Sequence, residues 1–140
     1  ISFYLSEKAS TLYIFDIDAD KAGMLKSHLL KIRKNVERAD EIKDLSGIDI
    51  IINATPLGLK PGGPLPCDIK LLKPAHIVGD LIYKETPLLR KASAKGCKTF
   101  NGLGMLLWQG VLAFELWTGH TPPHQIMLDA LLKRIKQQQA

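Results

Sequence analysis

The sequence predicts an α/β fold in which helices flank a parallel sheet. Short runs rich in β-branched residues alternate with segments of helical periodicity, and this alternation is typical of parallel sheets. The clearest strand, 48–55, contains four isoleucines within five positions. So dense a β-branched run predicts a strand that is covered on both faces. The length of 140 residues suits a single domain spanning 1–140.

The first part of the chain predicts two helix–strand pairs and one further short helix. The opening segment resembles the second half of an amphipathic helix, with Phe3 and Tyr4 facing inward and Glu7 and Lys8 facing outward. An acidic turn and then a regular apolar stripe follow the first strand. The expected elements are a helix ending near Ala9, a strand at 11–15, a helix at 19–32, a strand at 35–38 and a brief helix at 40–47 that Gly47 stops.

The second part continues the alternation after a loop rich in proline and glycine at 56–68. Thr86 is a candidate N-cap, Pro87 suits the first helical position, and Gly96 suits a helix end. The expected elements are strands at 76–83 and 97–100 and helices at 86–96, 101–119 and 121–137.

The helix at 101–119 is apolar on nearly every face. Gln109 and Glu115 interrupt the run, which is shorter than the roughly 20 residues that span a membrane, so we expect a buried core helix and no membrane contact. A buried amide without partners costs about 1–3 kcal/mol. Gln109 is therefore expected to meet either the backbone of another element or a polar ligand, on the same face as Met105 one turn earlier.

The distribution of charge and the placement of the cysteines argue against some classes of protein. The net charge is +5, but the basic residues are spread over expected helix surfaces without interleaved aromatics, which argues against a nucleic-acid-binding protein. The two cysteines, Cys67 and Cys97, are far apart, and the four histidines are scattered. We expect free thiols, no metal site and a cytoplasmic protein.

Polar or flexible residues follow each expected strand. In parallel sheets, ligands bind beyond the carboxyl ends of the strands, so these positions are candidates for a binding site. They are Asp16 and Asp18 after the first strand, Asn53 and Thr55 after the isoleucine-rich strand, Leu81 and Tyr83 in the next, and Asn101 and Gly102 before the apolar helix.

Asp16 has two interpretations. In a dinucleotide-binding unit, an acid at this point accepts hydrogen bonds from the adenosine ribose and repels a 2′-phosphate. The alternative is that Asp16 caps the following helix, although Asp18 is closer to the helix start. The glycine-rich turn of such a unit would lie about 20 residues upstream. It would precede Ile1, so we expect this chain to be part of a longer polypeptide.

Three stretches carry a family resemblance: NATPLG, GDLIYKETPLLRKASAKG and NGLGMLLWQGVLAFELWTG. In this order and spacing they resemble the carboxyl-terminal half of the shikimate dehydrogenase family, from about Ile1 to Leu132. The resemblance implies a Rossmann-like nicotinamide-binding domain that lacks its first strand and glycine-rich loop and ends in a helical pair. It also implies an amino-terminal substrate domain and the interconversion of 3-dehydroshikimate and shikimate, a step towards chorismate and the aromatic amino acids. Close relatives also use quinate.

The same resemblance implies roles for individual residues. Tyr83 matches a tyrosine near the substrate, and Gln109 matches a glutamine that hydrogen-bonds it. Leu81, Gly102 and Met105 match positions that line the nicotinamide, and Asn53 and Thr55 match the stretch that passes the cofactor. The family's catalytic lysine and aspartate belong to the amino-terminal domain, so we expect no catalytic residue in this chain and no turnover by the chain alone.

The cofactor is expected to be NAD or NADP, with NAD favoured. Family members that use NADP usually carry Asn-Arg-Thr where this chain has Asp16, Ile17 and Asp18. Acids in that place resemble the NAD-using members, although Lys21 could offset part of their charge.

Two further expectations concern assembly and a rival function. Without the first strand of the sheet, the strands at 11–15 and 48–53 would lose a shared neighbour, which predicts marginal stability or a homodimer. The rival interpretation is a non-catalytic small-molecule sensor or interaction module that retains the fold.

Overall fold

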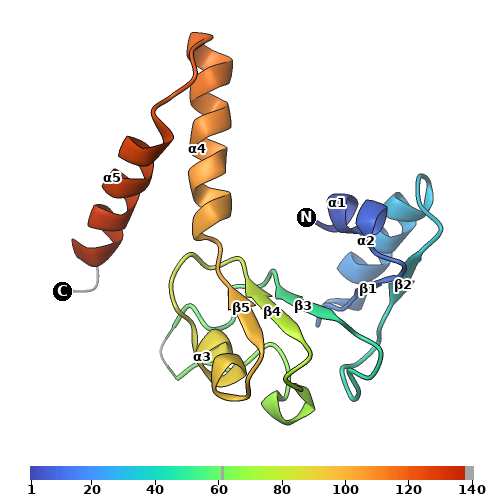
Figure 1. The fold of residues 1–140 in the computed structure, drawn as a ribbon. Helices are drawn as coiled ribbons and strands as arrows, with labels where there is room; N and C mark the ends of the chain where they lie inside the picture. The colour runs from blue at the N-terminus through green and yellow to red at the C-terminus, as the bar shows by residue number, and fades with distance from the viewer. Residues whose placement is uncertain (61, 138–140) are drawn as a thin grey trace. The chain divides into compact units, whose positions relative to one another are not determined.

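The computed structural model describes residues 1–60 and 62–137. They form two compact units, residues 1–45 and the described residues from 46 to 137, which Figure 1 colours blue to teal and green to red. Each unit contains a parallel ladder with covering helices, which confirms the α/β prediction. The single domain expected from the length stays a prediction.

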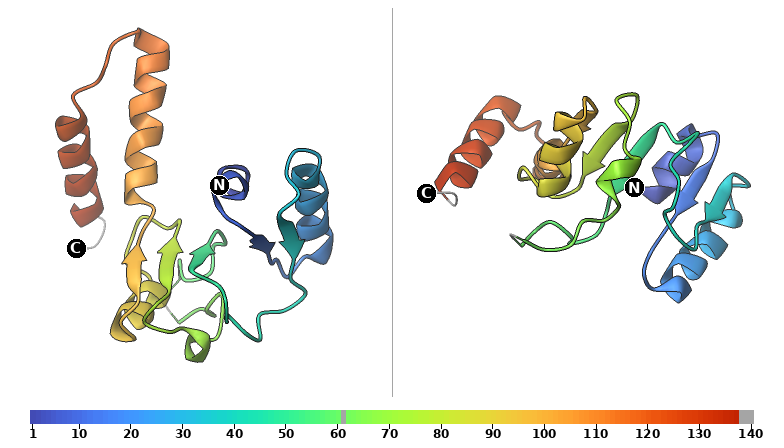
Figure 2. Two further views of the ribbon diagram at one scale, coloured as in Figure 1. Left: turned by 45° about the vertical axis from the view of Figure 1, so that its right-hand side comes forward. Right: turned by 90° about the horizontal axis from the view of Figure 1, so that it is seen from below.

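The first unit is a parallel β-α-β arrangement with one additional helix. Its elements are α1 (Ser2–Lys8), β1 (Leu12–Ile14), α2 (Ala19–Leu30) and β2 (Val36–Arg38). The two strands pair in parallel, with Leu12 opposite Val36, and α2 packs against β2 (Figure 2). Ile14, Ala22, Leu29 and Val36 form the buried core of this unit.

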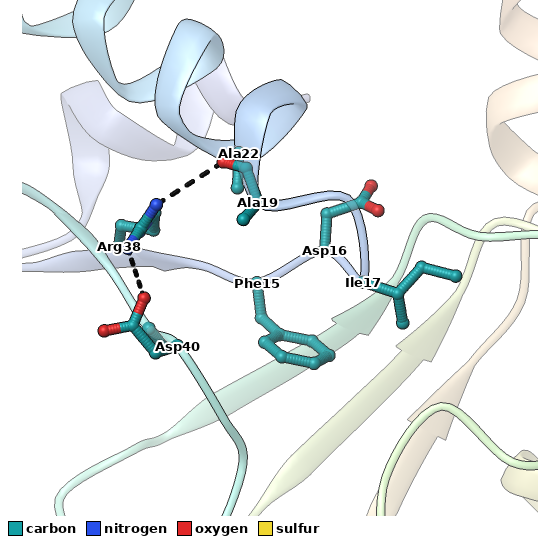
Figure 3. A pocket seen from close by; sticks show the side chains of 8 residues that line it. Phe15, Asp16, Ile17, Ala19, Ala22, Arg38 and Asp40 are labelled. Atoms are coloured by element: carbon teal, nitrogen blue, oxygen red, sulfur yellow. Dashed lines mark hydrogen bonds and ion pairs between the residues drawn. The ribbon is translucent and has the colours of Figure 1, made fainter.

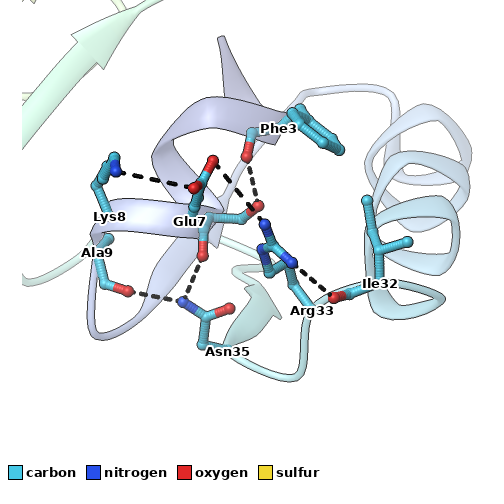
Figure 4. Close-up of polar contacts among 8 residues, drawn as sticks. Phe3, Glu7, Lys8, Ala9, Ile32, Arg33 and Asn35 are labelled. Atoms are coloured by element: carbon cyan, nitrogen blue, oxygen red, sulfur yellow. Dashed lines mark hydrogen bonds and ion pairs between the residues drawn. The ribbon is translucent and has the colours of Figure 1, made fainter.

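Polar bonds fasten α1 to this unit (Figure 4). The Asn35 amide donates to the carbonyl oxygens of Ser6 at 2.9 Å and Ala9 at 2.7 Å. These bonds satisfy carbonyls at the end of the helix, where no intrahelical donor remains. Ser6 is consequently buried, with its hydroxyl donating to the carbonyl of Phe3 at 2.7 Å.

The orientation expected for the aromatic residues of α1 is wrong. Phe3 and Tyr4 are 56% and 61% exposed, because the face fixed by Ser6 and Asn35 is a different one. The Arg33 guanidinium lies 5.9 Å from the centre of the Phe3 ring, a distance at which cation–π attraction operates at an exposed site.

The brief helix expected at 40–47 is also wrong. These residues form bends and a turn that ends at Gly47, whose φ is +76°. The Asp40 carboxylate pairs with the Arg38 guanidinium instead of capping a helix. A segment this short gains too few intrahelical bonds to offset the cost of helix nucleation.

The second unit is a three-stranded parallel sheet with helices attached. Its strands are β3 (Ile50–Asn53), β4 (Ile77–Asp80) and β5 (Lys98–Phe100), in the order β3-β4-β5. The remaining elements are the 3₁₀ helix η1 (Ile69–Leu71), which the sequence did not predict, α3 (Pro87–Ala94), α4 (Leu103–Thr118) and α5 (His124–Gln137). Pro61, inside the expected loop at 56–68, lies outside the described residues.

The predicted ends of α3 are confirmed. Thr86 caps it by accepting from the Leu89 amide at 3.4 Å, and Gly96 follows it with a φ of +84°. Leu88, Leu89 and Ala92 are buried where α3 packs against β4 and β5.

The prediction that β3 is covered on both faces is wrong for this chain. Ile50 is 48% exposed, and Ile51 and Ile52 are only partly buried. Within the described residues β3 pairs with β4 alone. The strand therefore has one unpaired edge, as expected if a shared neighbour is missing.

The buried environment expected for α4 is wrong as well. Val111 is its only buried residue, whereas Leu116 and Trp117 are 83% and 81% exposed. Within the described chain, the helix that packs along α4 is α5, where Trp108 meets the His124 ring edge-on at 5.1 Å. Because α5 covers only one side of α4, the apolar side chains on the other sides of α4 are exposed to solvent. No helix among the described residues is long and apolar enough to cross a membrane.

Gly102 fixes the junction between β4 and α4. A Cβ atom added at this position would lie 2.0 Å from the carbonyl oxygen of Leu81, a distance that no side chain tolerates. Gly104, two positions later, has open space around the equivalent atom.

We predict that Gly102→Ala lowers the free energy of unfolding by about 1–3 kcal/mol, because the backbone must shift to admit the methyl group. Gly104→Ala is the matched control and should leave stability unchanged or raise it by up to about 1 kcal/mol, since alanine favours the helix. Denaturant titration followed by far-ultraviolet circular dichroism measures both. Equal stability of the two variants would contradict the close approach at Gly102.

Candidate functional site

A small cavity lies at the carboxyl ends of β1 and β2 in the first unit (Figure 3). Its volume is about 240 Å³, and its lining includes Phe15, Asp16, Ile17, Ala19, Arg38 and Asp40. It combines apolar side chains with three ionisable ones, and the turn into α2 forms one wall. The structure thus places Asp16 where the strand-end rule predicts a ligand.

The two aspartates after β1 have different tasks. Asp18 caps α2, because its carboxylate accepts from the Lys21 amide at 3.1 Å. Asp16 accepts from the Asp18 amide at 2.9 Å, which shapes the turn, and its side chain lines the cavity. The alternative in which Asp16 caps the helix is therefore wrong.

Lys21 is committed to Asp18. Its ammonium group lies 3.0 Å from the Asp18 carboxylate. The side-chain bond to Lys21 lowers the pKa of Asp18, and the same bond raises the pKa of Lys21. Lys21 is not among the residues that line the cavity, so its charge compensates Asp18 more directly than Asp16.

Arg38 is a cavity residue that the sequence analysis missed. Its guanidinium donates to the Asp40 carboxylate and to the carbonyl oxygen of Ala19, the latter at 3.5 Å. An arginine at the end of a short parallel strand and an aspartate two positions later are the signal that could have identified the pair.

A buried polar network occupies the carboxyl ends of β3 and β4 in the second unit. Asp80 is fully buried and accepts from the Asn53 amide at 3.2 Å, the Ile82 amide at 3.1 Å and the Thr86 hydroxyl at 2.8 Å. The sequence analysis also missed Asp80, although an acid inside a buried strand needs partners of this kind.

Asn53 and Thr55 belong to this network. The Asn53 amide also donates to the Leu57 carbonyl at 3.0 Å, and its oxygen accepts from both the amide and the hydroxyl of Thr55. Asn53 is itself 3% exposed, so its side chain holds the turn after β3 in place. Any ligand at this edge would meet the turn that Asn53 shapes.

The structure brings Asn53, Leu81 and Gly102 together through their backbones. The Leu81 amide donates to the Asn53 carbonyl at 3.0 Å, and Gly102 lies directly against the Leu81 carbonyl. The first turn of α4 begins there: Gly102 offers no capping side chain, and the Asn101 side-chain oxygen accepts from the Leu103 amide at 3.1 Å. The remaining amide groups of this turn and Gly104 leave space for a polar or flat ligand.

The three remaining candidate residues, Tyr83, Met105 and Gln109, are all at least partly exposed. Tyr83 is partly buried, with the Lys84 ammonium 5.7 Å from the centre of its ring. Met105 is 38% exposed, and Gln109 is exposed one turn further along α4. The inference that Gln109 needs a partner because its amide is buried is therefore wrong, and its role rests on the family resemblance.

Comparisons with known proteins relate this chain to the shikimate dehydrogenases. Residues 102–132 match the family described as the Shikimate 5′-dehydrogenase C-terminal domain. The shikimate dehydrogenase (NADP(+)) of Methanocaldococcus jannaschii is 37% identical over 145 residues, which cover 96% of this chain and 51% of that protein. The shikimate dehydrogenase (NADP(+)) of Desulforamulus reducens is 47% identical over 97 residues, covering 66% of this chain and 33% of that one. The chain is related to the carboxyl-terminal half of the shikimate dehydrogenases.

Solved structures support the same relationship. The shikimate dehydrogenase from Aquifex aeolicus superposes with a TM-score of 0.84 at 32% identity, covering 94% of this chain and 48% of that chain. A quinate dehydrogenase from Corynebacterium glutamicum, in complex with NAD, gives a TM-score of 0.80 at 32% identity, over 94% and 50%. This chain thus spans about half the length of these relatives. The shared half has the Rossmann-like fold.

We predict that Asp80→Ala lowers the free energy of unfolding by about 3 kcal/mol, because buried donors on Asn53 and Thr86 lose their acceptor. Asp68→Ala is the control in the same unit, since Asp68 is exposed and accepts only from the Lys70 amide at the start of η1. It should cost about 1 kcal/mol or less. Thermal or denaturant unfolding compares the two, and an equal loss would contradict the central place given to Asp80.

Proposed function

We propose that this chain is the cofactor-binding half of a shikimate dehydrogenase, an oxidoreductase that interconverts 3-dehydroshikimate and shikimate with NAD or NADP. The observation that carries the proposal is the junction of β4 and α4. There Gly102, the first residue of the stretch that matches the family, packs against the Leu81 carbonyl, and the amide groups after Leu103 in the first turn of α4 have no side-chain cap. Both units together would form one dinucleotide-binding domain spanning 1–140.

The described residues fit a nicotinamide dinucleotide. Asp16 and Asp18 would contact the adenosine ribose. Asn53 and Thr55 would fix the conformation of the loop that runs past the cofactor. Leu81, Gly102 and Met105 would line the nicotinamide, where a side chain at Gly102 could not fit. When bound, the nicotinamide supplies or accepts the hydride of the reaction.

The proposed cofactor preference is NAD, with NADP as the alternative. A carboxylate at Asp16 accepts hydrogen bonds from ribose hydroxyls and repels a 2′-phosphate. The curated relatives described above are NADP(+) enzymes by name, whereas the related quinate dehydrogenase was solved with NAD.

The substrate would be shikimate or 3-dehydroshikimate, with quinate as a further candidate. Relatives of this fold have been solved with shikimate bound. Tyr83 and Gln109 would orient the substrate, as the family resemblance implies, because each carries a polar group that can hydrogen-bond it. Catalytic lysine and aspartate residues would come from an amino-terminal substrate domain, so this chain alone would be inactive. The reaction would serve aromatic amino acid synthesis in the cytoplasm.

The exposed apolar side chains of α4 support the proposed substrate domain. Its large side chains Trp108, Leu112, Leu116 and Trp117 are more than half exposed. An exposed apolar patch of this kind is typical of a surface that packs against another protein domain. The alternative cover is a second copy of this chain, in a homodimer.

The experiment is a chimera that joins the amino-terminal half of the Methanocaldococcus jannaschii enzyme to this chain. We predict that the chimera oxidises shikimate with NAD or NADP, and that this chain alone does not. A chimera that unfolds cooperatively but oxidises neither shikimate nor quinate would contradict the proposal.

We predict that Gln109→Ala in the active chimera raises KM for shikimate roughly tenfold, the effect of losing one or two hydrogen bonds. Its melting temperature should not change, because Gln109 is exposed. Gln125→Ala, which removes an exposed amide from α5, is the control and should alter neither value. A lower melting temperature with unchanged KM would assign Gln109 a structural role instead.

A further inference from the structure

The cavity in the first unit holds an unequal set of charges. Two carboxylates, Asp16 and Asp40, line it together with a single guanidinium, that of Arg38 (Figure 3). The three groups give the described lining a net charge of −1 at neutral pH. A ligand with a 2′-phosphate would bring about −1.5 to −2 further charge into this space.

The Arg38 guanidinium is accessible but already paired. Its side chain is 37% exposed, and it donates to Asp40 on one side and to the Ala19 carbonyl on the other. The Asp40 side chain is 76% exposed, so it holds the guanidinium from the solvent side of the cavity. Any phosphate that reached Arg38 would have to displace or approach this carboxylate.

Arginine suits phosphate for a geometric reason. Its planar fork of donors matches two phosphate oxygens, and these charge-assisted bonds are stronger than neutral ones. Arg38 lies in the same cavity as Asp16, the residue proposed to meet the ribose hydroxyls. A 2′-phosphate on that ribose would therefore be repelled by Asp16 and attracted by any free donors of Arg38.

We propose that Arg38 and Asp40 set the choice between NAD and NADP, with Asp40 occupying the guanidinium that would otherwise bind the 2′-phosphate. The inference rests on the proposed cofactor site and deepens it. It adds a second determinant of cofactor choice to Asp16. The Asp16 carboxylate repels the 2′-phosphate, and the ion pair with Asp40 keeps the Arg38 guanidinium from binding it.

The test compares binding of 5′-AMP and 2′,5′-ADP to this chain by isothermal titration calorimetry. The unmodified chain should prefer 5′-AMP. Asp40→Asn should shift the ratio of the two dissociation constants roughly tenfold towards 2′,5′-ADP, which is about 1.4 kcal/mol. Asp40→Ser should act in the same direction and serves as the second variant if the asparagine form folds poorly.

Glu37→Gln is the matched control. Glu37 precedes Arg38 on β2 and pairs with Lys26 at 3.1 Å, and it is not part of the cavity lining. It changes the net charge of the chain by the same amount as Asp40→Asn, so a general electrostatic effect would move both variants equally. The ratio for Glu37→Gln should stay that of the unmodified chain. Adding Arg38→Ala to Asp40→Asn should abolish the gain for 2′,5′-ADP.

The outcomes separate this inference from the proposed function. If 5′-AMP binds but Asp40→Asn and Glu37→Gln give the same ratio, the role of Arg38 and Asp40 is overturned while the cofactor site stands. If the gain persists without Arg38, the inference is likewise overturned. If neither nucleotide binds the unmodified chain at millimolar concentration, both the inference and the proposed cofactor site fall.

Discussion

The buried carboxylate of Asp80 is the constraint on which the second unit depends. It accepts from β3 through Asn53, from the segment after β4 through Ile82, and from the N-cap of α3 through Thr86. Removing a charged group from water is unfavourable unless its oxygens are satisfied, so these donors must stay in place whenever the unit is folded. The same bonds fix the turn at 53–57 and the chain that leads to Leu81. The candidate site at this edge of the sheet is thus held by side chains that point into the protein.

Local sequence signals predicted the elements well where the deciding interaction is itself local. Thr86, Pro87 and Gly96 delimit α3 because capping bonds and backbone conformation act within a few residues. The strands and both carboxyl-terminal helices were also predicted from local signals, namely the patterns of their apolar residues. The helix expected at 40–47 is the exception: Asp40 pairs with Arg38, and the segment is too short to offset the cost of helix nucleation.

Burial was predicted less well than secondary structure. Apolar periodicity shows which side chains favour burial, but it does not show which element covers them. The fully apolar α4 and the isoleucine-rich β3 were both expected inside a core, yet Leu116 and Ile50 are exposed in the described chain. In the candidate site, Asp16, Asn53 and Gly102 were found by their positions after strands. Asp80 was missed because its contact with Asn53 joins two strands that are 27 residues apart in the sequence. Arg38 was missed although Asp40 is only two positions away, because the sequence does not show that the pair lines a cavity.

The most direct test of the cofactor-binding claim is an NMR titration of the isotopically labelled chain with NAD. The account predicts saturable shifts of the backbone amides around Asp16 and Ala19 in the first unit and around Gly102 and Gly104 in the second. Shifts confined to α5, or no saturable shift at either strand edge, would contradict it.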